Sequence, residues 1–358
     1  MPRKHEKDQL ILPFPGDNEV EYKEIVKQNW QFTFSHQHIT SVFSKRVIGL
    51  IIAQIKEEDK MRDFYHVQAA DIVQATDMNK HEIYSAMRSV IFELFHVFFV
   101  FENEKKQIII PRHLVDSTRF KNPIAYRNGV LTIAFNPALR DMIMELAHYS
   151  EYELSAYLRF SSWYSMRLWE LLGAFKDTGW WQPSIEEYRG LMGCGYDYNP
   201  RTGKLKTDKK GNSKYMKYPN TSDMISKTTA EPLKELKGTE FEFTVESIPE
   251  KRVGKGRPKI VALRFNLVFH QLSDAEKIER WSNDNAKFKN AVERLRKWKI
   301  SDKNIVKYAY AIGSERINQL LYSWQIKNTS KAPIGNPLVY CNKVFVAEGK
   351  RAIVKKAI

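Results

Sequence analysis

The sequence predicts an α+β fold, mostly helical, in which a group of helices followed by a β-hairpin occurs twice and a small helical segment follows. Apolar residues recur at helical spacing along most of the 358-residue chain. Two hairpins are predicted, and each follows a group of helices. The strands of the second hairpin alternate apolar and polar residues, as strands with one buried face do. A chain of this length has room for two or three domains with a substantial core.

The composition favours a polyanionic partner. The chain has 57 Lys and Arg residues against 42 Asp and Glu residues, which gives a net charge of +15. Each cation that neutralises a phosphate releases condensed counterions, so a surplus of this size suits nucleic acid. Apolar and aromatic residues run through the whole chain, so it is not a disordered basic tail.

The two cysteines, Cys194 and Cys341, lie far apart and offer neither zinc-ligand spacing nor a disulfide framework. We therefore expect no metal, no cofactor and a reducing cytoplasm. The charged N-terminus has no apolar stretch behind it, so no secretory signal is expected. No window approaches the roughly 18 apolar residues of a membrane span, and no membrane partner is expected.

Residues 1–38 are predicted to form an irregular lead-in because Pro13 and Pro15 oppose helix, with a short strand near residues 30–34. The motif His36-Gln37-His38 has two interpretations. Rolling-circle nucleases hold a divalent ion with a His-hydrophobic-His pair and attack with a tyrosine, here Tyr22. The middle residue is polar in this chain, which favours a polar turn before a helix.

Residues 39–148 are predicted to form the first domain. A wide apolar stripe over residues 42–55 indicates a helix that Thr40 or Ser41 can cap. A strand at 64–67, helices at 69–76 and 78–96, and a hairpin of 98–101 with 107–111 follow. Lys80, Tyr84 and Arg88 recur every four residues on a face of the third helix different from its buried one.

Residues 149–270 repeat this order and form the second domain. A segment at 136–157 reads as a helical link, and helices are predicted at 162–176, 184–192 and 218–238. The last helix has Pro219 at its start and Gly238 at its end. Met224, Ile225, Thr228 and Leu236 share an inward face. The outward face is short and polar, and it comprises Asn220, Ser222, Asp223, Ser226 and Lys227.

Alternating runs at 241–245 and 261–269 form the second hairpin. Its loop has five cations and no acid: Lys251, Arg252, Lys255, Arg257 and Lys259. A polar helix followed by such a hairpin is the plan of a winged helix, in which the helix reads the major groove and the hairpin tip lies along phosphate or in the minor groove. The Gly-Arg-Pro core of the loop resembles an AT-hook, which favours minor-groove insertion of Arg257. The alternative is a solvated hairpin tip.

Two further segments complete the chain. Residues 196–217 hold seven cations, among them Lys214 and Lys217, against two acids, and we expect this loop to become ordered on a phosphate backbone. The alternative is a solvated loop. Residues 271–358 are predicted to be a helical appendage, with a helix or helix pair at 278–298 and short helices at 305–310 and 317–324. A docking role for a partner protein is the hypothesis for this segment.

The runs Tyr164-Ser165-Met166-Arg167-Leu168-Trp169-Glu170-Leu171-Leu172, Ile185 to Gly193 and Glu231 to Leu236 resemble the initiator replication proteins of theta-replicating plasmids. The resemblance implies two winged helices that bind double-stranded origin repeats (iterons), open the duplex and recruit the host initiator and replicative helicase. It also implies autorepression by a homodimer, here through the first domain. Arg167 matches the family's helix arginine, assigned to phosphate or to intramolecular support, and Pro232 matches a proline inside the recognition helix. The loop after Met192 is longer than the family pattern.

The leading hypothesis is therefore a non-enzymatic DNA-binding initiator. Two alternatives remain open on the sequence: a nicking enzyme that uses His36, His38 and Tyr22, and a winged-helix transcriptional repressor that never starts replication. The repressor shares every DNA-binding feature with the initiator. Only a replication assay separates these two.

Overall fold

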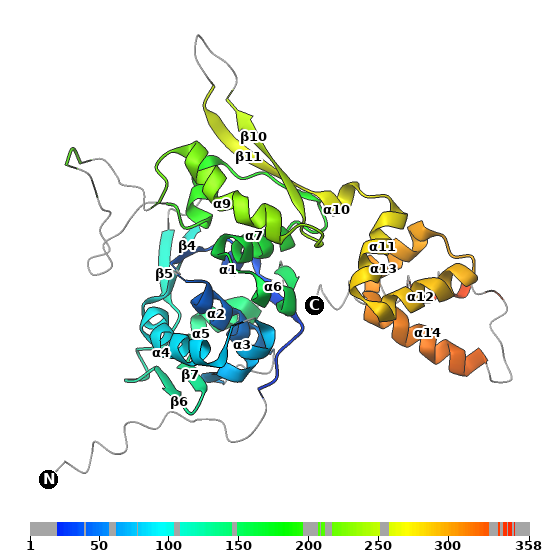
Figure 1. Ribbon diagram of the computed structural model, residues 1–358, viewed down its shortest axis with the longest axis horizontal. Helices are drawn as coiled ribbons and strands as arrows, with labels where there is room; N and C mark the ends of the chain where they lie inside the picture. The colour runs from blue at the N-terminus through cyan, green and yellow to red at the C-terminus, as the bar shows by residue number, and fades with distance from the viewer. Residues whose placement is uncertain are drawn as a thin grey trace. The chain divides into compact units, whose positions relative to one another are not determined.

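A computed structural model describes residues 20–38, 41–56, 62–76, 78–103, 108–144, 149–195, 207, 209–211, 217–250 and 258–328, with 336, 339–341, 343–345 and 347 (Figure 1). The chain divides into two compact units, Met1–Leu267 and Val268–Ile358. The first unit contains both hairpin-bearing arrangements predicted from the sequence. The second is helical throughout its described elements.

The first winged helix follows the predicted order of elements as far as its third helix. Ser41 caps its first helix as the sequence predicts, because its side chain accepts a hydrogen bond from Ser44 N. Asn79 forms a reciprocal capping box with Glu82, which was not predicted from the sequence. The elements of the first winged helix are α2 (Val42–Gln54), β3 (Phe64–Gln68), α3 (Ala69–Ala75), α4 (Lys80–His96), β6 (Ile124–Arg127) and β7 (Val130–Ala134). The three strands form one antiparallel sheet in the order β3-β7-β6.

The wing of this first winged helix is the β6–β7 hairpin, which was not predicted from the sequence. Its turn is Asn128-Gly129, and both residues have positive φ, 51° and 81°. Two consecutive left-handed residues make a type I′ turn, which matches the twist of a hairpin and favours Asn-Gly. The hairpin that was predicted, β4 (Phe98–Asn103) with β5 (Ile108–His113), instead forms a separate sheet with β2 (His36–His38) in the order β2-β4-β5.

Residues 25–38 are ordered, so the prediction of an irregular lead-in is wrong for this part. β1 (Ile25–Asn29) pairs with β8 (Tyr149–Glu153), a strand inside the link predicted as helical. Ser150 and Tyr152 of β8 are buried and alternate with partly or fully exposed residues, which is the period of a strand. A strand was expected near residues 30–34, but α1 (Trp30–Thr33) is a helical turn because Asn29 caps it by accepting from Gln31 N at 2.6 Å. The link also holds two helices, α5 (Pro137–Met144) and α6 (Leu154–Arg159).

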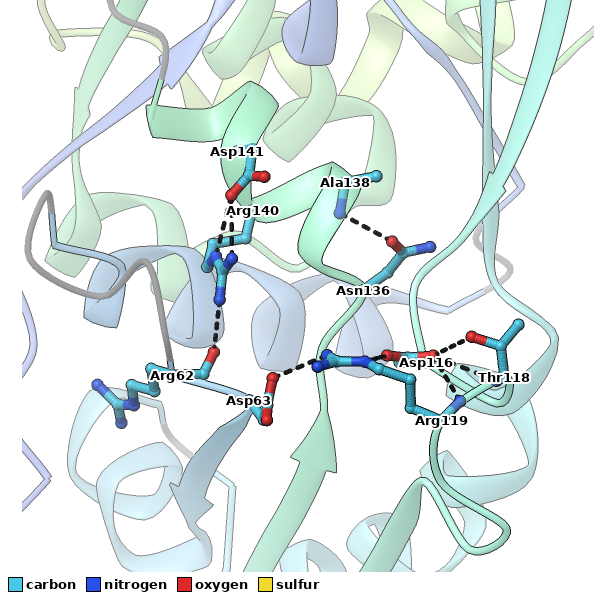
Figure 2. Close-up of polar contacts among 9 residues, drawn as sticks. All are labelled: Arg62, Asp63, Asp116, Thr118, Arg119, Asn136, Ala138, Arg140 and Asp141. Atoms are coloured by element: carbon cyan, nitrogen blue, oxygen red, sulfur yellow. Dashed lines mark hydrogen bonds and ion pairs between the residues drawn. The ribbon is translucent and has the colours of Figure 1, made fainter.

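Two arginines bind the residues just before β3, one from the loop before β6 and one from helix α5 (Figure 2). Arg119 donates to Asp116 and, at 2.7 Å, to Asp63, the residue before β3. Arg140 of α5 donates to the carbonyl of Arg62 at 2.8 Å and also contacts Asp141. These contacts join segments far apart in the sequence.

The second winged helix has the same order of elements. It comprises α7 (Trp163–Gly173), β9 (Trp180–Trp181), α8 (Ile185–Leu191), α9 (Thr221–Glu235), β10 (Phe243–Pro249) and β11 (Ile260–Leu267). Its sheet order is β10-β11-β9, so the first strand pairs with the last in both modules. Figure 1 shows the β10–β11 hairpin projecting away from the helices. The predicted α+β fold with tandem winged helices is therefore confirmed.

The second unit is the helical segment predicted at the end of the chain. Its elements are α10 (Val268–Gln271), α11 (Asp274–Asp284), α12 (Ala286–Lys297), α13 (Asp302–Ile312) and α14 (Ser314–Asn328). They enclose a core of their own, in which Phe288, Leu295, Tyr308 and Trp324 are buried. Among the residues that the structure describes, no helix of either unit combines the length and the apolar character needed to cross a bilayer.

Candidate nucleic-acid interface

Helix α9 begins at a fixed point because two hydrogen bonds and one backbone conformation define its start. The side chain of Asn220 accepts from Ser222 N at 2.9 Å and caps the helix. The buried Arg189 of α8 donates to the carbonyl of Tyr218 at 2.7 Å. Tyr218 has a φ of 48°, a left-handed conformation that turns the chain into the helix. α8 thus positions the helix that follows it.

The inward face of α9 matches the prediction. Met224, Thr228 and Leu236 are buried, and Pro232 is buried inside the helix. The Thr228 hydroxyl lies 2.7 Å from the phenol oxygen of Tyr188 and donates to the carbonyl of Met224 at 2.8 Å. A buried hydroxyl is tolerated here because it has partners on both sides.

The outward face of α9 carries the predicted polar residues. Ser222, Asp223, Ser226 and Lys227 are all exposed, and so is the capping residue Asn220. These side chains supply donors and acceptors at the spacing of neighbouring helical turns. Such a face can reach base edges in a major groove.

The far end of α9 is held against the start of α7. One carboxylate oxygen of Glu235 accepts from Ser161 N at 2.8 Å and from the Ser161 hydroxyl at 2.5 Å. With the contacts to Tyr188 and Arg189, the helix is fixed at its start, middle and end. Side chains that read base edges gain specificity when the element bearing them is rigid.

The strands of the β10–β11 hairpin pair from Phe243 opposite Leu267 to Pro249 opposite Ile260, and the register shifts between Ile248 and Pro249. Lys259 lies just before β11, its side chain is exposed, and its carbonyl accepts from Glu250 N at 2.8 Å. The remaining predicted cations of the tip, Lys251, Arg252, Lys255 and Arg257, lie outside the described residues. The AT-hook hypothesis for Arg257 therefore stays a prediction.

Helix α4 of the first module corresponds to α9 in the order of elements. Ile83, Met87, Val90 and Leu94 face the core, whereas Tyr84 and Arg88 are exposed, as predicted. The Tyr84 ring lies against Gly129 in the turn of the β6–β7 hairpin, because a Cβ added there would be 3.4 Å from the ring. The exposed side of α4 and the wing tip thus lie next to each other. The side chain of Lys80 is outside the described set.

Arg167 does not fit the expected phosphate contact. Its side chain is fully buried in α7, where it donates to the carbonyls of Ser35 and Leu191 and to Glu170. A guanidinium without solvent access cannot touch DNA from this position. Of the two roles assigned from the family resemblance, intramolecular support is the one that the geometry allows.

The basic loop after Met192 is described only in part. Lys217 is exposed just before α9, and Lys209 and Lys210 are exposed farther back, whereas Lys214 lies outside the described residues. The prediction that this loop becomes ordered on phosphate stays a prediction.

Sequence reasoning missed the residues that hold the helix in place. Arg189 contacts a carbonyl 29 positions away, and Ser161 contacts Glu235 74 positions away. It also missed Arg264 of β11, whose guanidinium lies over the Trp180 ring at 4.6 Å. No local pattern marks these pairs, because their partners meet only in the folded chain.

Tyr22 and His36, two residues of the nicking hypothesis, are held by contacts inside the fold. The Tyr22 phenol donates to Asp71 of α3 at 2.5 Å, and burial together with this carboxylate raises the pKa of Tyr22. An activated nucleophile has a lowered pKa. The His36 ring packs against Gly190 of α8, since a Cβ added there would lie 2.6 Å from Nε2. β2 is a strand paired with β4, not the polar turn expected for this motif.

Two exposed helices, each set between a supporting helix and a hairpin, define a double winged-helix protein. Residues 25–173 match the family model described as "Initiator Replication protein, WH1". The resemblance of the chain to the plasmid initiator family is therefore confirmed over these residues, which are similar to the domain that the family model describes. The match runs from β1 to the end of α7.

The structure is also similar to a solved one, "Crystal structure of Pi initiator protein in complex with iteron DNA". The two chains are 18% identical, with a TM-score of 0.49, over 69% of this chain and 98% of that chain. The comparison with curated proteins found no match.

Proposed function

We propose that this chain is a plasmid replication initiator that binds repeated origin sequences through its two winged helices. The exposed polar face of α9 carries the proposal: Ser222, Ser226 and Lys227 face solvent on a helix held at both ends. The match of residues 25–173 to initiator replication proteins supports replication as the process served. Contacts to phosphate would position the protein, and contacts to base edges would select the repeat.

Opening of the duplex, recruitment of a host initiator and helicase, and autorepression are the finer parts of the proposal. They rest on the resemblance to the family and on the tandem arrangement of the modules. Two modules in one chain suit two successive grooves of one duplex. The chain would then act by binding and by bending or melting DNA, with no covalent step of its own.

The first domain offers a surface for a second copy of the chain. β5 lies at the edge of its sheet and, among the described strands, pairs with β4 alone. Ile109 and Ile110 on this strand are 65% and 40% exposed. An open edge with exposed apolar side chains is a template for strand pairing. We place the proposed homodimer contact at this edge.

Footprinting of the DNA that flanks the gene of this protein tests the proposal. We expect protection of a repeated sequence, at a spacing set by two modules on one chain. A plasmid that carries the protected region should replicate only when the protein is supplied. Protection without replication would reduce the function to repression, and the absence of any protected repeat would overturn sequence-specific binding.

Sedimentation of two variants tests the dimer contact. Ile109→Lys places a charge on the open edge and should shift the protein toward monomer. Val261→Lys is the control, because Val261 is a 38% exposed apolar residue of β11 in the other module. An unchanged dimer in Ile109→Lys, or an equal shift toward monomer in both variants, would contradict the placement.

A further inference from the structure

The chain's positive charge is concentrated in the second unit. Residues 268–358 hold 18 Lys and Arg residues against 8 Asp and Glu residues, so a quarter of the chain supplies ten of its fifteen net charges. Within the unit the charges are segregated. Four of the eight acids lie on α11, at Asp274, Glu276, Glu279 and Asp284, whereas residues 287–307 hold eight cations and two acids.

One ion pair fixes the turn between α12 and α13. Arg296 contacts both carboxylate oxygens of Asp302, with Nε to Oδ1 and Nη2 to Oδ2 each at 3.0 Å. This bidentate contact uses one of the two acids of the segment and joins the end of α12 to the start of α13. Lys299 within the turn adopts a φ of 58°.

Four lysines around this turn form what we name the C-terminal cation patch: Lys297, Lys299, Lys303 and Lys307. All four side chains are exposed, and none forms an ion pair with another residue that the structure describes. Lys303 and Lys307 are one helical turn apart on α13, whose opposite side buries Ile305 and Tyr308. The patch therefore lies on the solvent side of two packed helices. The acid next to it, Asp302, is already paired with Arg296.

We propose that the C-terminal cation patch is a third DNA-binding surface, which contacts the phosphate backbone of duplex DNA without reading its sequence. Lysine is a flexible point charge that suits phosphate, and the patch has none of the planar groups that pair bidentately with a base edge. α11 begins at Asp274, seven residues after β11 ends at Leu267. A surface tethered this closely meets DNA held by the first unit at high effective concentration.

The inference extends the proposed function and has its own test. In the full-length chain, Lys303→Gln with Lys307→Gln removes two patch charges, and Lys297→Gln with Lys307→Gln is a second variant of the patch. Lys277→Gln with Lys343→Gln removes the same charge from α11 and from the region after α14. Affinity for the footprinted fragment and for a random duplex is measured over a series of salt concentrations. A circular-dichroism melt checks that each variant folds.

We expect both patch variants to bind DNA more weakly and with a smaller dependence on salt. The slope of log affinity against log salt should fall by about 0.9 for each phosphate that the variant no longer neutralises. The ratio of the affinities for the footprinted and random duplexes should stay unchanged, because interactions with the phosphate backbone do not distinguish sequences. The control pair should keep the slope of the parent protein.

Three results would overturn the inference. An unchanged slope in both folded patch variants would assign the patch to an acidic protein partner or to solvent. An equal fall of the salt slope in the control pair would mean that the effect comes from net charge alone. A loss of affinity for the footprinted fragment only would mean that the patch contacts bases. Should no fragment be footprinted at all, the proposed function fails, while the slope on the random duplex still tests the patch.

Discussion

Lys45 Nζ lies 2.8 Å from Glu170 Oε1, and both side chains are 2% exposed. The pair joins α2 of the first winged helix to α7 of the second. Glu170 also accepts from Arg167 at 3.1 Å and from the Tyr157 phenol at 2.8 Å. Burial lowers the pKa of Lys45 to about 8, although the charge of Glu170 opposes this shift. Two cations thus share one buried carboxylate where the two modules meet.

Glu170→Gln should lower the free energy of unfolding by about 3–5 kcal/mol, because it leaves two buried cations without a counter-charge. Urea unfolding at neutral pH measures the change. Glu231→Gln is the matched control: Glu231 is an exposed residue of α9 that pairs with Lys234, and its replacement should change stability by no more than about 0.5 kcal/mol. Similar values for the two variants would show that the buried cluster is not what holds the modules together.

His66 of β3 should make the first module sensitive to acid. Burial, together with the charge of Arg62, lowers the pKa of His66 from 6.5 to about 4. The unfolded chain therefore takes up this proton first as the pH falls. The contribution of neutral His66 to the free energy of unfolding is fully present above about pH 6.5. It is lost as the pH falls from there to about 4.

His66→Gln keeps a polar partner for Thr132, which lies 2.9 Å from the ring, but it cannot titrate. Between pH 7 and pH 5 this variant should lose about 1–2 kcal/mol less stability than the parent protein. Unfolding curves at the two pH values measure the difference. His81→Gln, on the exposed face of α4, should behave like the parent. A parent-like decrease in His66→Gln would contradict the prediction.

Much of the fold could be predicted because local rules decide it. The apolar stripes of α2 and α4, the cap at Ser41 and the box at Asn79 are readable within one turn of helix. The β6–β7 hairpin was also readable from its Asn-Gly turn but was not predicted. β1 and β8 were not readable, because each is a short strand whose partner lies more than a hundred residues away.

Some features of the candidate site could likewise be predicted from the sequence, and others could not. Periodicity alone separates the buried Met224 and Thr228 from the exposed Ser226 and Lys227 on α9. It does not reveal that Arg167 is enclosed, since its burial depends on carbonyls of Ser35 and Leu191 brought together by the fold. The prediction of a phosphate contact for Arg167 therefore failed, because this arginine supports the interior of the fold.

Arg88 tests whether the first module touches the duplex. It is exposed on α4, so Arg88→Ala should weaken binding to cognate and random DNA by the same factor and lower the salt slope by about 1 if it meets a phosphate. Arg159→Ala removes the same charge from an exposed position at the end of α6 and should leave the slope unchanged. Equal slopes for the two variants would mean that Arg88 does not contact phosphate.

Lys227 tests base reading by the second module. It is exposed on the outward face of α9, next to Ser226, and a contact to a base edge there is worth about 1–3 kcal/mol of discrimination. Lys227→Ala should therefore lower affinity for the cognate repeat by this amount and leave affinity for random duplex DNA nearly unchanged, as anisotropy titrations at fixed salt would measure. Lys237→Ala, an exposed lysine just past the end of the helix, should cause no such selective decrease. An equal decrease on both DNAs in Lys227→Ala would limit this lysine to phosphate, and the selection of bases would then fall to its neutral and acidic neighbours on the same face.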